Sequence, residues 1–202
     1  MKSLTFYTHP QSRGNTVRWM LEESGASFDT VLMDFDGSLQ SPAYLAINPM
    51  GKIPTLRYGD TVITEAAAII LFLADLFPEK QLAPAVGTAE RGEYYRWFCF
   101  MVGPMEAAIM EKFWKLTPPP EASKSLGYGD FERVVHTIEQ ALTGKSYLVG
   151  AQFTAADLYL CAFLQFSYRM QVWPESSVCR NYIQRIEQRE AYIRAMRSME
   201  TA

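Results

Sequence analysis

Cysteine is scarce in this sequence, and the few cysteines are far apart. There are three, Cys99, Cys161 and Cys179, an odd number without a CxxC pair. Such spacing predicts neither a disulfide framework nor a zinc site. We therefore expect a protein of a reducing compartment that holds no metal.

An excess of charge of one sign is also missing. The chain has 19 Lys and Arg against 22 Asp and Glu, a formal net charge of -3, and its basic residues are scattered rather than massed. Nucleic-acid binding depends on a basic patch or stripe. We therefore expect no nucleic-acid partner, and a small or neutral ligand fits better.

Long hydrophobic runs are absent as well. No stretch has the roughly 20 apolar residues needed to cross a bilayer, and no apolar signal region precedes the first strand pattern. Apolar residues make up 49% of the chain and charged residues 20%, the balance of a globular protein with a sizeable core. We expect a cytoplasmic protein without a membrane partner.

The first eighty residues alternate between strand and helix patterns. Strand patterns cover Leu4 to Tyr7, Phe28 to Met33, Thr55 to Tyr58 and Val62 to Ile63, and helix patterns end near Gly25 and run from Glu65 to about Leu76. A two-residue turn, Gly59-Asp60, joins the last two strands. This order predicts an α/β domain with a mixed β-sheet and flanking helices over residues 1–78.

Helical patterns alone follow a linker predicted at 79–87. They cover Ala89 to Leu116, Phe131 to Leu142, Thr154 to about Ser167, Asn181 to Arg189 and Ala191 to Met199. Three prolines at 118–120 forbid continuation of the first helix, and the third is apolar almost all round, which predicts a central position. Residues 88–202 are therefore predicted to form an all-α helical bundle.

The loop after the first strand contains the first candidate site. It reads His9-Pro10-Gln11-Ser12-Arg13-Gly14 and leads into a helix. Unpaired N–H groups and the positive end of the macrodipole favour an anion such as a thiolate at a helix start, and the Ser12 hydroxyl is placed to add a donor. The alternative is that Ser12, Asn15 or Thr16 only caps the helix.

Two further segments fit either a structural or a binding role. Asn48-Pro49-Met50-Gly51-Lys52-Ile53-Pro54 precedes a strand and predicts a constrained turn. If Ile53-Pro54 were cis, against the ordinary preference for trans, the Ile53 backbone would face outward to pair with an extended peptide. Glu65 opens a helix, where a carboxylate is stabilising without a ligand; alternatively it holds a ligand's ammonium group.

A fourth segment, Phe153-Thr154-Ala155-Ala156-Asp157-Leu158, predicts a capping box. Thr154 is the N-cap and Asp157 stands at N3, with Phe153 and Leu158 spaced as a hydrophobic staple. Its role is structural.

Taken together, these four segments resemble the cytosolic glutathione transferase family, and the His9-Pro10-Gln11-Ser12 run looks especially like its serine-type classes. The resemblance spans essentially the whole chain. It implies a thioredoxin-like N-terminal domain, a helical C-terminal domain and a homodimer with the active site between domains. It also implies that the Ile53-Pro54 bond is cis.

The resemblance assigns site residues too. Those matched to glutathione binding are Ser12, Lys52, Ile53, Pro54, Glu65 and Ala66. Ser12 corresponds to the hydroxyl residue that donates to the glutathione sulfur. Lys52 and the Ile53 backbone would hold the cysteinyl and glycyl parts, while Glu65 and the Ala66 N–H would hold the γ-glutamyl end.

The sequence departs from the family's pattern at Ala66, where most members have Ser. The backbone donor survives, but a side-chain hydrogen bond to the γ-glutamyl carboxylate is lost, about 1.5–3 kcal/mol for a charged acceptor. For thiol activation, alternatives to Ser12 are Tyr7, where tyrosine-type classes place their donor, and the neighbouring Arg13 and Asn15.

The acceptor substrate is expected on the helical domain, against apolar side chains of the first long helix. The candidates are Tyr95, Met101, Met105, Phe113 and Trp114. Methionine side chains adapt to varied apolar molecules. The alternative is that this stripe belongs to the core.

The resemblance thus implies an enzyme that conjugates the thiol of reduced glutathione, its co-substrate, to electrophilic, largely apolar small molecules. A glutathione-dependent reductase or peroxidase would need a nucleophilic cysteine near the first helix, and the first domain has none. A non-catalytic partner-binding protein of the same fold is the third hypothesis, and Ala66 is the feature that favours it.

Overall fold

The protein, seen in a computed structural model, is described over residues 2–200, with side chains given for all of these except 120 and 198–200. Its contacts form two compact units. We call Met1–Leu82 together with Arg189–Ala202 the α/β unit, and Ala83–Gln188 the helical unit.

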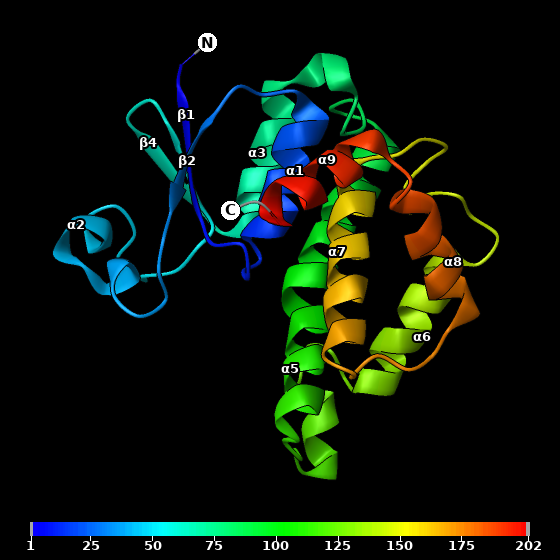
Figure 1. The fold of residues 1–202 in the computed structure, drawn as a ribbon. Coiled ribbons are helices and arrows are strands. Elements are labelled where there is room, and N and C mark those ends of the chain that lie inside the picture. Colours follow the sequence, from blue (N-terminus) through cyan, green and yellow to red (C-terminus); the bar gives the residue numbers. More distant parts are fainter. Residues whose placement is uncertain (1, 201–202) are drawn as a thin grey trace. The chain divides into compact units, whose positions relative to one another are not determined.

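The α/β unit contains the mixed sheet that the sequence predicts (Figure 1). Its elements are β1 (Leu4–Thr8), α1 (Gly14–Ser24), β2 (Asp29–Leu32), η1 (Ser38–Gln40), α2 (Pro42–Leu45), β3 (Thr55–Tyr58), β4 (Thr61–Thr64), α3 (Ala66–Leu76), η2 (Pro78–Lys80) and α9 (Glu190–Glu200). The strand order is β2-β1-β3-β4. β2 runs parallel to β1, whereas β3 is antiparallel to both β1 and β4.

Helices α1 and α3 pack against each other and against the sheet. The alternating pattern of β1 turns Leu4 and Phe6 into the core, where they are 2% and 0% exposed. Helix α1 ends at Gly25, whose left-handed φ of 67° favours glycine and stops the helix as predicted. The buried side chains of β1 and the stop of α1 at Gly25 thus fix where these two elements lie in the α/β unit.

Arg189, which directly precedes α9, and Arg194 within α9 form ion pairs with two acidic residues of α1. Glu22 and Glu23 lie in the last turns of α1, where the helix dipole disfavours carboxylates. Arg189 donates to both oxygens of Glu23 at 2.7 and 2.8 Å, and Arg194 donates to Glu22 at 3.2 Å. These contacts group α9 with the α/β unit, whereas the sequence pattern places it in the range 88–202; the predicted domain boundaries stay a prediction.

The helical unit consists of helices over the rest of the chain. They are α4 (Ala89–Phe100), η3 (Met101–Met105), α5 (Glu106–Trp114), η4 (Pro120–Lys124), α6 (Phe131–Leu142), α7 (Ala155–Arg169) and α8 (Ser177–Ile186). α7 is buried on most of its surface and contacts both α4 and α8. The expected central helix is confirmed.

The sequence pattern predicts one uninterrupted helix from Ala89 to Leu116, and this prediction is wrong in the middle of the segment. Met101–Met105 forms a π-helical turn with Pro104 inside it, so the segment divides into α4, η3 and α5. Proline has no N–H to donate and its ring clashes with the carbonyl four residues back, and a π turn accommodates both. The pattern of apolar residues could not reveal this break.

The capping box before α7 is confirmed and extended by two more donors. Asp157 accepts hydrogen bonds from the Thr154 N–H and hydroxyl at 2.8 and 3.1 Å, from the Leu148 N–H at 2.7 Å, and from the Tyr182 hydroxyl at 2.8 Å. Burial raises the pKa of the Asp157 carboxyl, and the four donors oppose that effect. The box therefore ties α7, α8 and the preceding loop together.

Candidate functional site

The register of the sheet brings the predicted binding segments to one edge. Tyr7 pairs with Thr55 and Thr55 pairs with Thr64, so these three residues form a row across β1, β3 and β4. Neighbouring strands lie about 4.8 Å apart. The loop after β1, the turn before β3 and the residues after β4 therefore leave the sheet side by side. We call this the sheet-edge site.

The hydroxyl of Ser12, in the loop of the sheet-edge site, both donates and accepts a hydrogen bond. It donates to the His9 carbonyl at 2.7 Å and accepts from the Gly14 N–H at 3.0 Å. Arg13, not Ser12, is the N-cap residue of α1, and the Ser12 hydroxyl instead bonds the first N–H of that helix. To donate to a ligand, the hydroxyl proton of Ser12 would have to turn away from His9.

Two other candidate donors near this loop, Asn15 and Tyr7, have contacts of their own. The Asn15 side chain donates to the Pro10 carbonyl at 2.6 Å, and the ring of Tyr7 packs against Tyr44 with 5.8 Å between ring centroids. A Cβ added to Gly14 would meet the Thr8 hydroxyl at 1.9 Å. Glycine at this position therefore permits the first turn of α1 to approach the end of β1.

The turn before β3 has the cis Ile53-Pro54 bond that the resemblance implies. The Lys52 carbonyl accepts from the Tyr44 hydroxyl at 2.7 Å and from the Asn48 side chain at 2.8 Å. Burial raises the pKa of the Tyr44 hydroxyl, against the effect of its hydrogen bonds. The Lys52 side chain itself is exposed, which leaves its ammonium group available to a ligand.

Glu65 differs from the sequence prediction in its backbone. It lies just before α3 rather than in its first turn, with φ 67° and ψ 117°, and it is exposed. A non-glycine residue at positive φ costs about 1–3 kcal/mol. Its side chain does not cap the helix, so the first N–H groups of α3, beginning with Ala66, lack that acceptor.

The sheet-edge site thus combines opposite charges with backbone donors. Lys52 supplies a cation and Glu65 a carboxylate, and α1 and α3 both begin there. Helix N-termini attract anions, while a carboxylate attracts an ammonium group. This arrangement suits an extended, peptide-like ligand with charges of both signs. Within residues 2–200, no cluster of three acidic, histidine or cysteine side chains could hold a metal ion.

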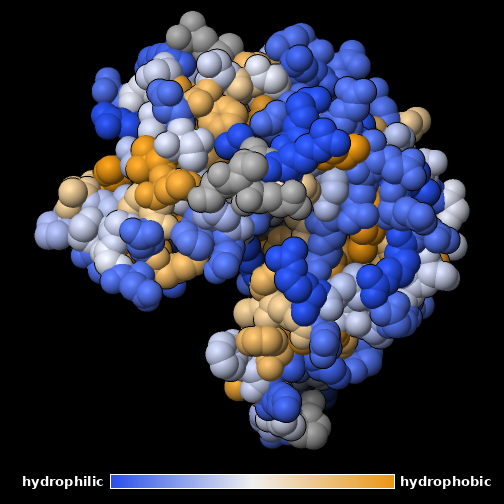
Figure 2. Space-filling view, viewed as in Figure 1, coloured by the Kyte–Doolittle hydropathy of each residue, from blue (hydrophilic) through white to orange (hydrophobic). Residues whose placement is uncertain are grey.

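The five acceptor-site candidates of the helical unit separate into two groups. Met101 and Met105 are 0% exposed on η3, which favours the alternative that they belong to the core. Tyr95, Phe113 and Trp114 are 45%, 39% and 67% exposed. Apolar side chains gather at the lower end of α5 in Figure 2.

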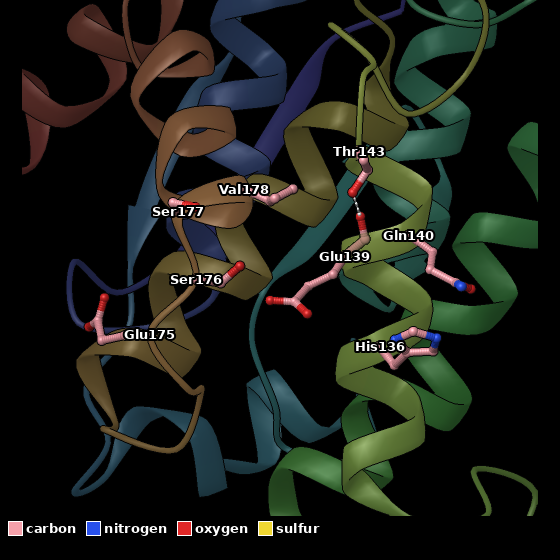
Figure 3. A pocket seen from close by; sticks show the side chains of 8 residues that line it. All are labelled: His136, Glu139, Gln140, Thr143, Glu175, Ser176, Ser177 and Val178. Atoms are coloured by element: carbon pink, nitrogen blue, oxygen red, sulfur yellow. Dashed lines mark hydrogen bonds between the residues drawn. The ribbon is translucent and has the colours of Figure 1, made fainter.

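A separate hollow in the helical unit contains none of the predicted residues. It measures about 410 Å³ and lies between α6 and the start of α8 (Figure 3). Its lining residues are His136, Glu139, Gln140, Thr143, Glu175, Ser176, Ser177 and Val178. The Glu175 carboxylate is paired with Arg180, and the hollow has no arrangement of groups that suggests chemistry.

Sequence reasoning missed two side chains that shape the sheet-edge site. Tyr44 and Thr55 are buried, and their hydroxyl groups form a hydrogen bond of 2.9 Å beside the Lys52 carbonyl. Tyr44 reads as an ordinary apolar position of a short helical turn, and Thr55 as an ordinary strand residue. Only the packing of α2 against the turn before β3 brings them together.

Comparison with known proteins finds family matches in both parts of the chain. The model of the N-terminal domain of glutathione S-transferase matches residues 2–75, and that of the C-terminal domain matches residues 106–190. Glutathione S-transferase GstA of Escherichia coli O157:H7 is 30% identical over 155 residues, which are 75% of this chain and 76% of that protein.

Solved structures agree over nearly the whole length. A glutathione transferase from Methylococcus capsulatus str. Bath has a TM-score of 0.79 at 29% identity, with 98% of this chain and 100% of that chain covered. A sphingomonad glutathione S-transferase complexed with glutathione has a TM-score of 0.78 at 25% identity, with 98% and 100% covered.

In the described part of this chain, no helix is both long and apolar enough to cross a membrane.

Proposed function

Because the chain belongs to the glutathione S-transferase family, we propose that it binds reduced glutathione at the sheet-edge site and transfers it to electrophilic, largely apolar small molecules. In this reaction the glutathione thiolate attacks an electrophilic carbon. A carbon–sulfur bond forms, the leaving group departs with the bonding electron pair, and the thiol proton goes to solvent. Proximity of the two reactants and stabilisation of the thiolate supply the rate enhancement.

The charges of the sheet-edge site suit the ends of the tripeptide. Glu65 binds the γ-glutamyl ammonium group, and the Ala66 N–H at the start of α3 binds the adjacent carboxylate. The Ile53 backbone pairs with the cysteinyl residue beside Pro54, and the Lys52 ammonium group faces the glycyl end. Ala66 supplies no hydroxyl, so this carboxylate has one donor fewer than a serine would give.

The backbone of Glu65 is the observation that carries this proposal. A glutamate at φ 67° before α3 gains nothing for the fold, since glycine would adopt that conformation without strain. Strain of this kind clusters at ligand sites. We infer that Glu65 is kept because its carboxylate and the exposed N–H groups beside it bind one end of glutathione.

Ser12 is proposed as the residue that activates the thiol. A free thiol with a pKa near 8.5 is only a few per cent ionised at neutral pH, and a hydroxyl donor prefers the thiolate. When glutathione is bound, the Ser12 proton turns from the His9 carbonyl to the sulfur. His9 retains the Ser12 backbone N–H as a donor, at 3.0 Å, so the loop keeps its shape.

Two measurements on the purified protein test the proposal. Calorimetric titration with reduced glutathione should give saturable binding below millimolar concentrations, and turnover of an activated aryl halide should depend on glutathione. Oxidised glutathione and S-methyl glutathione serve as ligands that cannot react. Absence of binding at millimolar glutathione would overturn the proposal.

A second candidate is a glutathione-binding protein of this family without transferase activity. Ala66 favours it, since the γ-glutamyl carboxylate has lost a hydroxyl donor. Glutathione binding without turnover of any of several aryl halides, epoxides and unsaturated carbonyl compounds would support this candidate. Restoring the donor with Ala66→Ser should then tighten binding without creating activity.

A further inference from the structure

The Lys52 carbonyl is fixed by a closed ring of three buried side chains. Tyr44, Asn48 and Thr55 are 3%, 3% and 0% exposed, and all three have a polar atom within 3.4 Å of that carbonyl oxygen. A buried polar group must be satisfied, and each of these groups has a limited number of protons to give. The arrangement of donors can therefore be worked out.

The amide of Asn48 sets the direction of the ring. Its Oδ1 accepts from the Met50 N–H at 3.1 Å, so its Nδ2 faces Lys52 and Thr55, at 2.8 and 3.3 Å. The two amide protons are used by the Lys52 carbonyl and the Thr55 hydroxyl oxygen. Asn48 thus serves as the fixed donor of the ring.

The two hydroxyls complete the ring without a leftover proton. The Tyr44 hydroxyl donates to the Lys52 carbonyl at 2.7 Å, and the Thr55 hydroxyl then donates to the Tyr44 oxygen at 2.9 Å. Every donor of the three side chains has one acceptor. The Tyr44 ring is itself held by a buried cluster with Met33 and Leu39.

The Lys52-Ile53 peptide is planar, so the direction of the Lys52 carbonyl also sets the direction of the Ile53 N–H. Lys52-Ile53 is a trans bond, so its N–H points opposite to its C=O. With the carbonyl turned into the ring, the Ile53 N–H is turned away from it. Among residues 2–200 this N–H has no acceptor. Its direction is therefore set by side chains that no extended ligand at this edge would contact.

We propose that Tyr44, Asn48 and Thr55 are positioning residues that hold the Ile53 amide in the direction required for pairing with the cysteinyl backbone of glutathione. This inference rests on the proposed function of the sheet-edge site. The ring acts on binding and leaves the activating group at Ser12 untouched. Breaking it should change the affinity for glutathione and not the ionisation of the bound thiol.

The test uses Tyr44→Phe, which removes the hydroxyl and keeps the ring packed, with Tyr58→Phe as the matched control. The Tyr58 hydroxyl makes no hydrogen bond among the described residues. Tyr44→Phe should weaken glutathione binding about three- to tenfold, raise KM for glutathione by the same factor and leave kcat at saturating glutathione and its pH profile unchanged. Tyr58→Phe should bind like the wild type.

A second pair of variants covers the case in which Tyr44→Phe does not fold. Thr55→Ser keeps the hydroxyl and should retain affinity, whereas Thr55→Val removes it and should lose affinity as Tyr44→Phe does. Wild-type affinity in Thr55→Val would overturn the inference, and so would an affinity of folded Tyr44→Phe equal to that of Tyr58→Phe. Failure of the wild type to bind glutathione would instead overturn the proposed function.

Discussion

The sheet-edge site of the α/β unit and the apolar stretch of the helical unit are built on different principles. The first is made of backbone groups held by the sheet register, the Lys52 carbonyl ring and the unusual φ of Glu65. The second is made of side chains on α4, η3 and α5, some in the core and some at the surface. A backbone site restricts which residues can stand there, whereas a side-chain site admits many.

The largest effect that would sharpen this comparison is expected at η3. Met105→Ala should lower the free energy of unfolding by about 2–5 kcal/mol, because truncating a fully buried side chain leaves a cavity. The affinity for glutathione should not change. Urea unfolding measures the first and calorimetry the second. Val102→Ala, 47% exposed on the same turn, is the control. Unchanged stability with an altered KM for the acceptor would make Met105 a pocket residue.

Glu65 is expected to give the next largest effect, on the α/β side. Glu65→Gln should weaken glutathione binding about tenfold to a hundredfold, since a charge-assisted hydrogen bond is worth about 1.5–3 kcal/mol. The variant should remain as stable as the wild type in urea. Glu79→Gln, exposed on η2, is the matched control. Equal affinity of the two variants would contradict the role of Glu65.

Ser12 should change the chemistry of the ligand more than its affinity. Ser12→Ala should raise the pKa of the bound glutathione thiol by about 1–2 units, because a donor to the thiolate is lost, and kcat at neutral pH should fall accordingly. Ultraviolet absorbance of the thiolate, followed against pH, measures this. Ser27→Ala, exposed before β2, is the control. If the pKa of the bound thiol does not move, Ser12 only holds the loop before α1 through His9 and Gly14.

The smallest effect is expected at the exposed end of α5. Trp114→Ala should change the free energy of unfolding by less than about 0.5 kcal/mol, as is usual at the surface. KM for apolar acceptors should rise a few-fold, more for larger acceptors, with glutathione affinity constant. Val86→Ala, 83% exposed, gives the baseline. A series of aryl halides of increasing size provides the readout, and no change across the series would remove Trp114 from the acceptor site.

The two regions also differ in how much of them the sequence could predict. Gly25, Pro54 and Thr154 each have a residue type that the local backbone demands, and the helix end, the turn and the capping box were predicted from them. The π turn around Pro104 was missed, because the apolar pattern continues through it. The role of Tyr44 was also missed, since it depends on a contact eight residues away along the chain that packing creates.

The burial of the methionines shows the limit for the helical unit. Met101, Met105 and Phe113 share one helical stripe in the sequence, yet the first two are fully buried and the third is 39% exposed. Apolar residues at helical spacing occur both in the core and at the surface. The distinction requires the neighbouring helices, which no local pattern describes.

The location of glutathione tests the central claim most directly. Titration of the ¹⁵N-labelled protein with S-methyl glutathione, followed by amide chemical shifts, reports which backbone N–H groups meet the ligand. We predict saturable shifts that are largest at Ile53, Ala66 and Gly14. Saturable shifts confined to Ala83–Gln188, or none at millimolar ligand, would contradict the assignment of the sheet-edge site.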